Sequence, residues 1–130
     1  PPVDAELVWA EVPAVRLEAG SAIVTVGQRS AGVFLIESGR AVVDAAGPDG
    51  GRSAVLLPGS VIGEISHLSG GPATATVSCE TDCVVRHMTE AWLADLARTD
   101  PARALAIGEF IARRLAEKLT AANRTIRALQ

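Results

Sequence analysis

The chain has 130 residues, 48% of them hydrophobic and 21% charged, and its formal net charge at pH 7 is −3. This length suits one domain, and this composition is typical of a folded globular chain rather than a disordered one. The acidic balance argues against a nucleic-acid-binding surface over the chain as a whole, and the apolar runs are far too short for membrane insertion.

The start of the chain indicates a piece of a longer protein. It begins with Pro1 instead of Met, and no signal peptide is visible. We therefore expect a cytoplasmic protein, or the cytoplasmic part of a larger or membrane-attached one. We also expect residues 1–13 to form an N-terminal helical segment.

From residue 14 onward, short apolar stretches alternate with turns rich in Gly, Pro, Asp and Ser. The candidate strands are 14–17, 22–26, 33–36, 41–44, 53–57, 73–78 and 83–88. Strands at this spacing predict a small antiparallel sandwich or barrel. No helical segment of about 10–15 residues separates them, so a parallel α/β sheet is not expected.

Two helix start signals follow the strands. Thr89 is a candidate N-cap for a short helix over 90–97. Asp100 then precedes Pro101, which favours the start of a long helix that runs to residue 129. Apolar residues recur along it at Ile107, Ile111, Leu115, Leu119, Ala122, Ile126 and Leu129. The last five have heptad spacing, so we expect the first half to pack on the barrel and the second half to pair with another helix or lead into a following domain.

A series of glycine-bearing turns and short motifs carries a family resemblance. In chain order they are Leu17-Glu18-Ala19-Gly20, Val26-Gly27, Glu37-Ser38-Gly39, Leu57-Pro58-Gly59-Ser60, Ile62-Gly63-Glu64-Ile65 and Pro72-Ala73-Thr74-Ala75-Thr76-Val77. Together they resemble the cyclic nucleotide-binding domain family, which includes Crp/Fnr-type regulators and the regulatory subunits of protein kinase A. The resemblance covers about residues 14–125.

The resemblance implies a mainly β fold with C-terminal helices. This is an eight-stranded antiparallel β-roll, a jelly-roll-like barrel, followed by a short helix and a long C-terminal helix that moves when ligand binds. The β-roll would span 14–100 and hold a phosphate-binding cassette at 62–77. The helix over 101–130 would act as a lid, a dimerisation element or a linker.

The resemblance also implies a ligand site in the cassette, for cAMP, cGMP or another small anion, with no further cofactor. By position, the Glu64 carboxylate accepts the ribose 2′-hydroxyl hydrogen, and Thr74 brings a hydroxyl near the phosphate or the base. The residues from Gly63 to Ser66 begin a short helix whose free N–H groups suit a phosphate. The candidate ligand-binding residues are Ile62, Gly63, Glu64, Ile65, Ser66, Ala73, Thr74 and Ala75.

One residue departs from the family pattern. Where the family has an arginine directly after the cassette proline, this chain has Ala73. That arginine is the main cationic partner of the cyclic phosphate, and removing one partner of a buried charge pair costs roughly 2–5 kcal/mol. Other candidates for the missing charge are His67, Arg40, Arg52 and Arg86. For His67 we favour a packed or surface-facing imidazole, and for the three arginines a solvated surface position.

Other chemistry has little support in the sequence. Cys79 and Cys83 flank a three-residue turn and could oppose each other across a hairpin, but small buried hydrophobes are favoured over a disulfide. His67 and His87 lie in separate predicted elements, so no metal site is expected. No Ser-His-Asp constellation, carboxylate pair or P-loop is present, so we do not expect an enzyme.

Two hypotheses for the function follow. The first is a regulatory domain that couples ligand binding at the cassette to movement of the C-terminal helix and an attached effector. The alternative is a degenerate domain that no longer binds cAMP or cGMP and serves as a dimerisation or interaction module. In either case the C-terminal helix would contact a second copy or an effector, and this fragment alone would not bind DNA.

Overall fold

The computed structural model describes residues 3–29, 32–44 and 52–129. The strands of this part are β1 (Ala14–Leu17), β2 (Ala22–Val24), β3 (Gly32–Ser38), β4 (Ala41–Asp44), β5 (Arg52–Leu56), β6 (Val61–Ile62), β7 (Thr76–Cys79) and β8 (Cys83–Thr89). The helices are α1 (Ala5–Trp9), α2 (Glu64–Ser69), α3 (Glu90–Thr99) and α4 (Pro101–Leu129).

The strands form two antiparallel four-stranded sheets, in the orders β1-β8-β3-β6 and β2-β7-β4-β5. A cluster of buried side chains from both sheets fills the space between them: Phe34, Ile36, Ala41, Ile62, Val77, Cys79, Cys83 and Val85. Since the buried positions come from facing strands of the two sheets, the sheets close over one interior. The predicted mainly β roll with C-terminal helices is confirmed.

Several strand boundaries differ from the prediction: β2 ends at Val24 rather than at residue 26, and β3 covers Gly32–Ser38 rather than 33–36. β6 is not among the seven candidate strands, because its two residues are too few to show alternation. The predicted strand 73–78 begins at Thr76 instead. The N–H of Ala73 donates to the Gln28 carbonyl at 2.9 Å, and the Ala73 carbonyl accepts from the Gly27 N–H at 2.8 Å. These bonds hold the residues before β7 against a turn rather than in a sheet.

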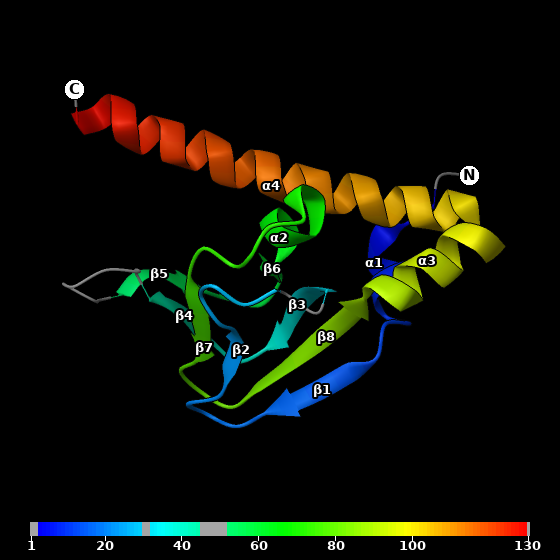
Figure 1. Ribbon diagram of the computed structural model, residues 1–130, viewed down its shortest axis with the longest axis horizontal. Helices are drawn as coiled ribbons and strands as arrows, with labels where there is room; N and C mark the ends of the chain where they lie inside the picture. Colours follow the sequence, from blue (N-terminus) through cyan, green and yellow to red (C-terminus); the bar gives the residue numbers. More distant parts are fainter. Residues whose placement is uncertain (1–2, 30–31, 45–51, 130) are drawn as a thin grey trace.

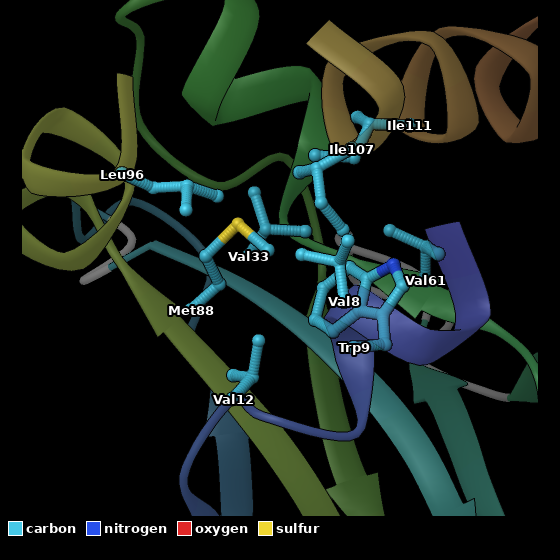
Figure 2. Packing of buried hydrophobic residues seen from close by; sticks show 9 residues of the cluster. All are labelled: Val8, Trp9, Val12, Val33, Val61, Met88, Leu96, Ile107 and Ile111. Carbon is cyan, nitrogen blue, oxygen red and sulfur yellow. The ribbon is translucent and has the colours of Figure 1, made fainter. Parts of the chain in front are cut away.

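The helices gather at one end of the β-roll around a second cluster of buried residues. Figure 2 shows this cluster, which consists of Val8, Trp9, Val12, Val33, Val61, Met88, Leu96, Ile107 and Ile111. It joins α1, α3 and the first half of α4 to β3, β6 and β8. The expectation that the first half of the long helix packs on its own β-roll is therefore confirmed.

Helix starts follow the capping signals. The N–H of Trp92 donates to the Thr89 hydroxyl at 3.0 Å, so Thr89 caps α3, which continues to Thr99. Pro101 is the first residue of α4. In the expected segment 1–13, α1 is short and is capped by the Asp4 side chain. Among the described residues, no helix has the length and hydropathy that a membrane crossing requires.

The second half of α4 extends away from the roll. In Figure 1, α4 passes over α2, and its C-terminal end, in red, stands clear of both sheets. Leu115 on this helix is half-buried and Leu119 is 57% exposed. The seam residues Ala122, Ile126 and Leu129 lie outside the described side chains, so helix pairing stays a prediction.

Candidate functional site

A cavity of about 290 Å³ lies between the β-roll, α2 and α4. The structure brings all eight predicted ligand-binding residues to its lining: Ile62, Gly63, Glu64, Ile65, Ser66, Ala73, Thr74 and Ala75. Apolar side chains from the second sheet complete the lining, among them Val24, Val43, Leu56 and Val77. Because the cassette and the sheet enclose one space, the site is a pocket rather than a surface patch.

Glu64 is the charged group that belongs to the cassette itself. It opens α2 directly after Gly63, whose φ of 86° lies in the left-handed region that glycine adopts without strain. Only 2% of Glu64 is exposed. A carboxylate this deeply buried requires a cation or several hydrogen-bond donors to offset its lost hydration.

Lys118 of α4 provides that compensation. Its Nζ forms an ion pair with Glu64 Oε1 and donates a hydrogen bond to the Val61 carbonyl oxygen at 2.7 Å. This residue is not among the site candidates predicted from the sequence. Helical spacing could have indicated it, because Lys118 follows Ile111 by seven residues. Both residues therefore lie on the side of α4 that packs against the roll.

The remaining cassette residues differ in exposure. Thr74 and Ile65 are exposed, and Ser66 and Ala75 are half-buried. Ala73 is 8% exposed and offers no donor from its side chain. The pocket therefore combines one buried carboxylate, hydroxyl groups and apolar walls. The ammonium of Lys118 lines it from α4, outside the β-roll.

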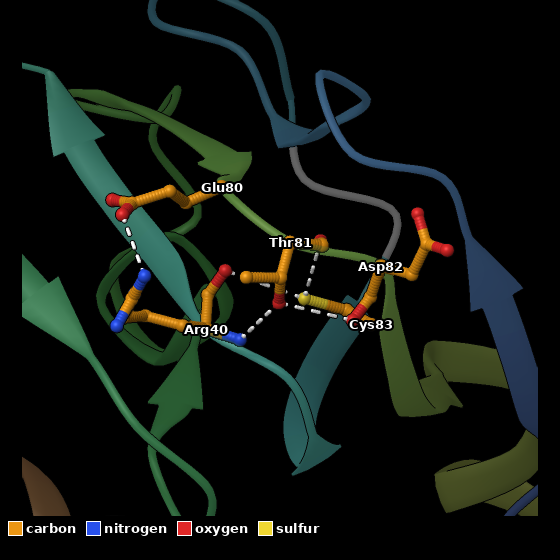
Figure 3. Close-up of polar contacts among 5 residues, drawn as sticks. All are labelled: Arg40, Glu80, Thr81, Asp82 and Cys83. Atoms are coloured by element: carbon orange, nitrogen blue, oxygen red, sulfur yellow. Dashed lines mark hydrogen bonds and ion pairs between the residues drawn. The ribbon is translucent and has the colours of Figure 1, made fainter.

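The other cations considered from the sequence lie elsewhere. Arg40 pairs with Glu80 at 2.9 Å, at a turn shown in Figure 3. Arg86 pairs with Glu37 at 2.8 Å and donates to the Val12 carbonyl at 2.9 Å. The side chain of Arg52 lies outside the described residues. Among the described residues that line the cavity, Lys118 is the one cation.

His67 is not part of the lining either. It is half-buried on α2, and its Nδ1 has no hydrogen-bond partner among the described residues. A packed or surface-facing imidazole, the interpretation that the sequence favoured, agrees with this placement.

β7 and β8 belong to different sheets and form no hairpin, but Cys79 and Cys83 lie close together in the cluster between the sheets. Both thiols are free and buried. Burial, with Cys83 and Asp82 beside it, raises the pKa of Cys79 to about 11. The Cys83 thiol donates to the Thr81 carbonyl oxygen at 3.4 Å and to that of Arg40 at 3.5 Å, contacts drawn in Figure 3. In the described part of the chain, no three His, Cys, Asp or Glu residues are grouped to hold a metal ion.

Comparison with known families identifies the fold. The family model for the cyclic nucleotide-binding domain matches residues 14–100. The chain belongs to this family. Residues 14–100 are therefore a domain of the cyclic nucleotide-binding type, as the resemblance implied.

Solved structures show the same fold. The catabolite activator protein of Thermus thermophilus is 22% identical, with a TM-score of 0.77 over 95% of this chain and 57% of that protein. A cyclic nucleotide-binding domain from Methylobacillus flagellatus is 18% identical, with a TM-score of 0.81 over 93% of this chain and 69% of that one.

The N-terminal domain of a transcriptional regulator from Streptomyces coelicolor A3(2) is also similar. It is 25% identical, with a TM-score of 0.71 over 89% of this chain and 82% of that domain. A search of curated proteins finds no match to the chain. The chain thus spans little more than half the length of the Thermus protein, and most of that N-terminal domain.

Proposed function

We propose that the cavity beside α2 binds a cyclic nucleotide, cAMP or cGMP. We also propose that this binding affects α4. The observation that carries this proposal is the buried Glu64 carboxylate, which lines the cavity together with the whole predicted cassette. A carboxylate that accepts a hydroxyl hydrogen forms a charge-assisted hydrogen bond, stronger than a neutral one. A ribose 2′-hydroxyl suits this acceptor.

The rest of the pocket supports a nucleotide of this size. Its volume of about 290 Å³ lies near the lower end of the range for small-molecule sites, about 300–1,000 Å³. Val24, Val43 and Leu56 offer apolar surface for a purine, and the hydroxyls of Ser66 and Thr74 offer polar contacts to phosphate or base. The domain would bind its ligand without chemical change, so we assign it no catalytic activity and no cofactor.

The effect of ligand binding would leave the domain through α4. We propose that residues 14–100 sense the ligand and that α4 transmits the change to an attached effector or a second copy of the chain. The exposed Leu119 on the extending half of α4 supports a contact of this kind. The two free thiols suit a reducing compartment, which supports a cytoplasmic location.

Isothermal titration with cAMP and cGMP tests the proposal on the wild-type chain, on Ala73→Arg and on Glu64→Gln. We expect one nucleotide per chain in the wild type and tighter binding by Ala73→Arg, which restores a planar cation fork for the phosphate. Glu64→Gln should weaken binding by about tenfold or more, since it loses the charged acceptor. Absence of binding by both the wild type and Ala73→Arg at millimolar nucleotide would overturn the proposal.

A further inference from the structure

We infer that Lys118 of α4 supplies the cation for the ligand's phosphate that the cassette lacks at Ala73. The anion-binding site would then be shared between the β-roll and the long helix. This inference rests on the proposed nucleotide-binding function and assigns the phosphate contact within it.

The charges around the cavity require such a partner. Among the described lining residues, the only charged side chains are those of Glu64 and Lys118, and their charges are opposite. A cyclic phosphate brings one further negative charge next to a carboxylate that is 2% exposed. Without a cation within a few ångströms, the two negative charges would repel each other in a medium that screens them poorly. Lys118 is in place to offset both.

The Lys118 ammonium has capacity for this contact. An ammonium carries three N–H donors. Two of them are directed to Glu64 Oε1 and to the Val61 carbonyl oxygen. The side chain is 42% exposed and lines the cavity, so its third donor can reach an acceptor there. A lysine on a flexible four-carbon stem can also shift between neighbouring acceptors.

The helix itself is held in the position that this role needs. Ile107 and Ile111, fully buried one turn apart, anchor α4 to the roll. Lys118 lies two further turns along the same face, where it contacts Glu64, the first residue of α2. A ligand phosphate that binds Lys118 therefore contacts α4 directly, and its affinity depends on where α4 lies. By linkage, ligand binding must shift the position of α4 in return.

Titration with cAMP across a set of α4 variants tests the inference. We expect Lys118→Met, which matches the length of the stem, to weaken binding by about tenfold or more. Lys118→Arg, which keeps the charge, should stay within about threefold of the wild type. Arg113→Met is the matched control, because Arg113 is 76% exposed on the same helix and does not line the cavity. It should bind as the wild type does.

A rescue variant separates a phosphate contact from a merely structural role. In the double variant Ala73→Arg/Lys118→Met, an arginine on the cassette should restore the affinity that Lys118→Met loses. If Lys118→Met does not fold because Glu64 loses its partner, Lys118→Gln replaces it with the same expected loss.

The outcomes distinguish this inference from the proposed function. Lys118→Met binding as tightly as the wild type, or more tightly, overturns the inference and identifies Lys118 as a bystander or a competitor for Glu64. Binding by Ala73→Arg with no binding by the wild type also overturns it, although the nucleotide function survives. Failure of both to bind removes the function and the inference together.

Discussion

Lys118 on α4 and Glu64 on α2 are 54 residues apart in the chain and form an ion pair beside the cavity. The same ammonium donates to the carbonyl oxygen of Val61, the residue that begins β6. One side chain therefore joins the long helix to the strand before the cassette and to the buried carboxylate within it. The carboxylate of the candidate site is thus in direct contact with α4.

The ion pair should contribute measurably to stability. Lys118→Met leaves Glu64 buried without its cation, and we expect the free energy of unfolding to fall by about 1–3 kcal/mol, discounted because the lysine is partly exposed. Urea denaturation measures the change. Arg113→Met removes the same charge from an exposed site and should change it by less than about 0.5 kcal/mol.

A double variant checks the cause of that loss. Glu64→Gln/Lys118→Met removes both charges, so it should recover part of the stability lost by Lys118→Met alone, because a neutral amide is less costly to bury than a carboxylate. Equal stability of the wild type and the single Lys118→Met variant would contradict the assigned pairing.

Two glycines with the same φ of +91° provide a second test, of the turn packing. A Cβ at Gly39 would lie 2.3 Å from the Asp82 carbonyl oxygen and 2.9 Å from the Cys83 Cα, whereas a Cβ at Gly20 would meet no atom within 4 Å. Gly20→Ala should cost only the left-handed backbone penalty, about 1–2 kcal/mol. Gly39→Ala should cost about 1–3 kcal/mol more, since backbone must move. Equal losses in thermal denaturation would contradict the turn geometry.

The raised pKa of Cys79 predicts a dependence of stability on pH. Burial raises this pKa from 9.0 to about 11, so the folded protein holds the thiol proton more tightly than the unfolded chain does. The stabilisation is therefore complete below pH 9 and is lost as the pH rises toward 11, by up to about 3 kcal/mol. The free energy of unfolding, measured by urea denaturation at pH 8 and pH 10.5, should fall less in Cys79→Ala than in the wild type. Parallel losses in both proteins would contradict the assignment.

Much of the fold could be predicted from local sequence signals. Glycines at turns, apolar stretches and the Thr89 cap predict the roll and α3 because each of these signals acts over a few residues. The two-residue strand β6 has no such signal, since alternation needs a longer run. Residues 73–75 alternate like a strand, yet the backbone of Ala73 bonds to the turn at Gly27 and Gln28. Sequence spacing alone does not reveal that pairing.

Part of the candidate site could also be predicted from local sequence. Its cassette residues are adjacent in the chain, so a family motif is enough to gather them around Glu64. The position of Lys118 depends on how α4 docks through Ile107 and Ile111, which is a long-range property of the fold. Its helical register relative to Ile111 places it on the inward face, but only the folded structure shows which carboxylate it meets.

The most direct test of the account is an NMR titration of the ¹⁵N-labelled wild-type chain with cAMP. We expect the amides of residues 62–66 and 73–75 to shift together with those of α4 around Lys118, with one saturation curve for both groups. The turn that holds Arg40 and Glu80 does not line the cavity and should remain unchanged. Shifts confined to the cassette, with α4 unaffected at saturation, would contradict direct coupling between the ligand site and the helix.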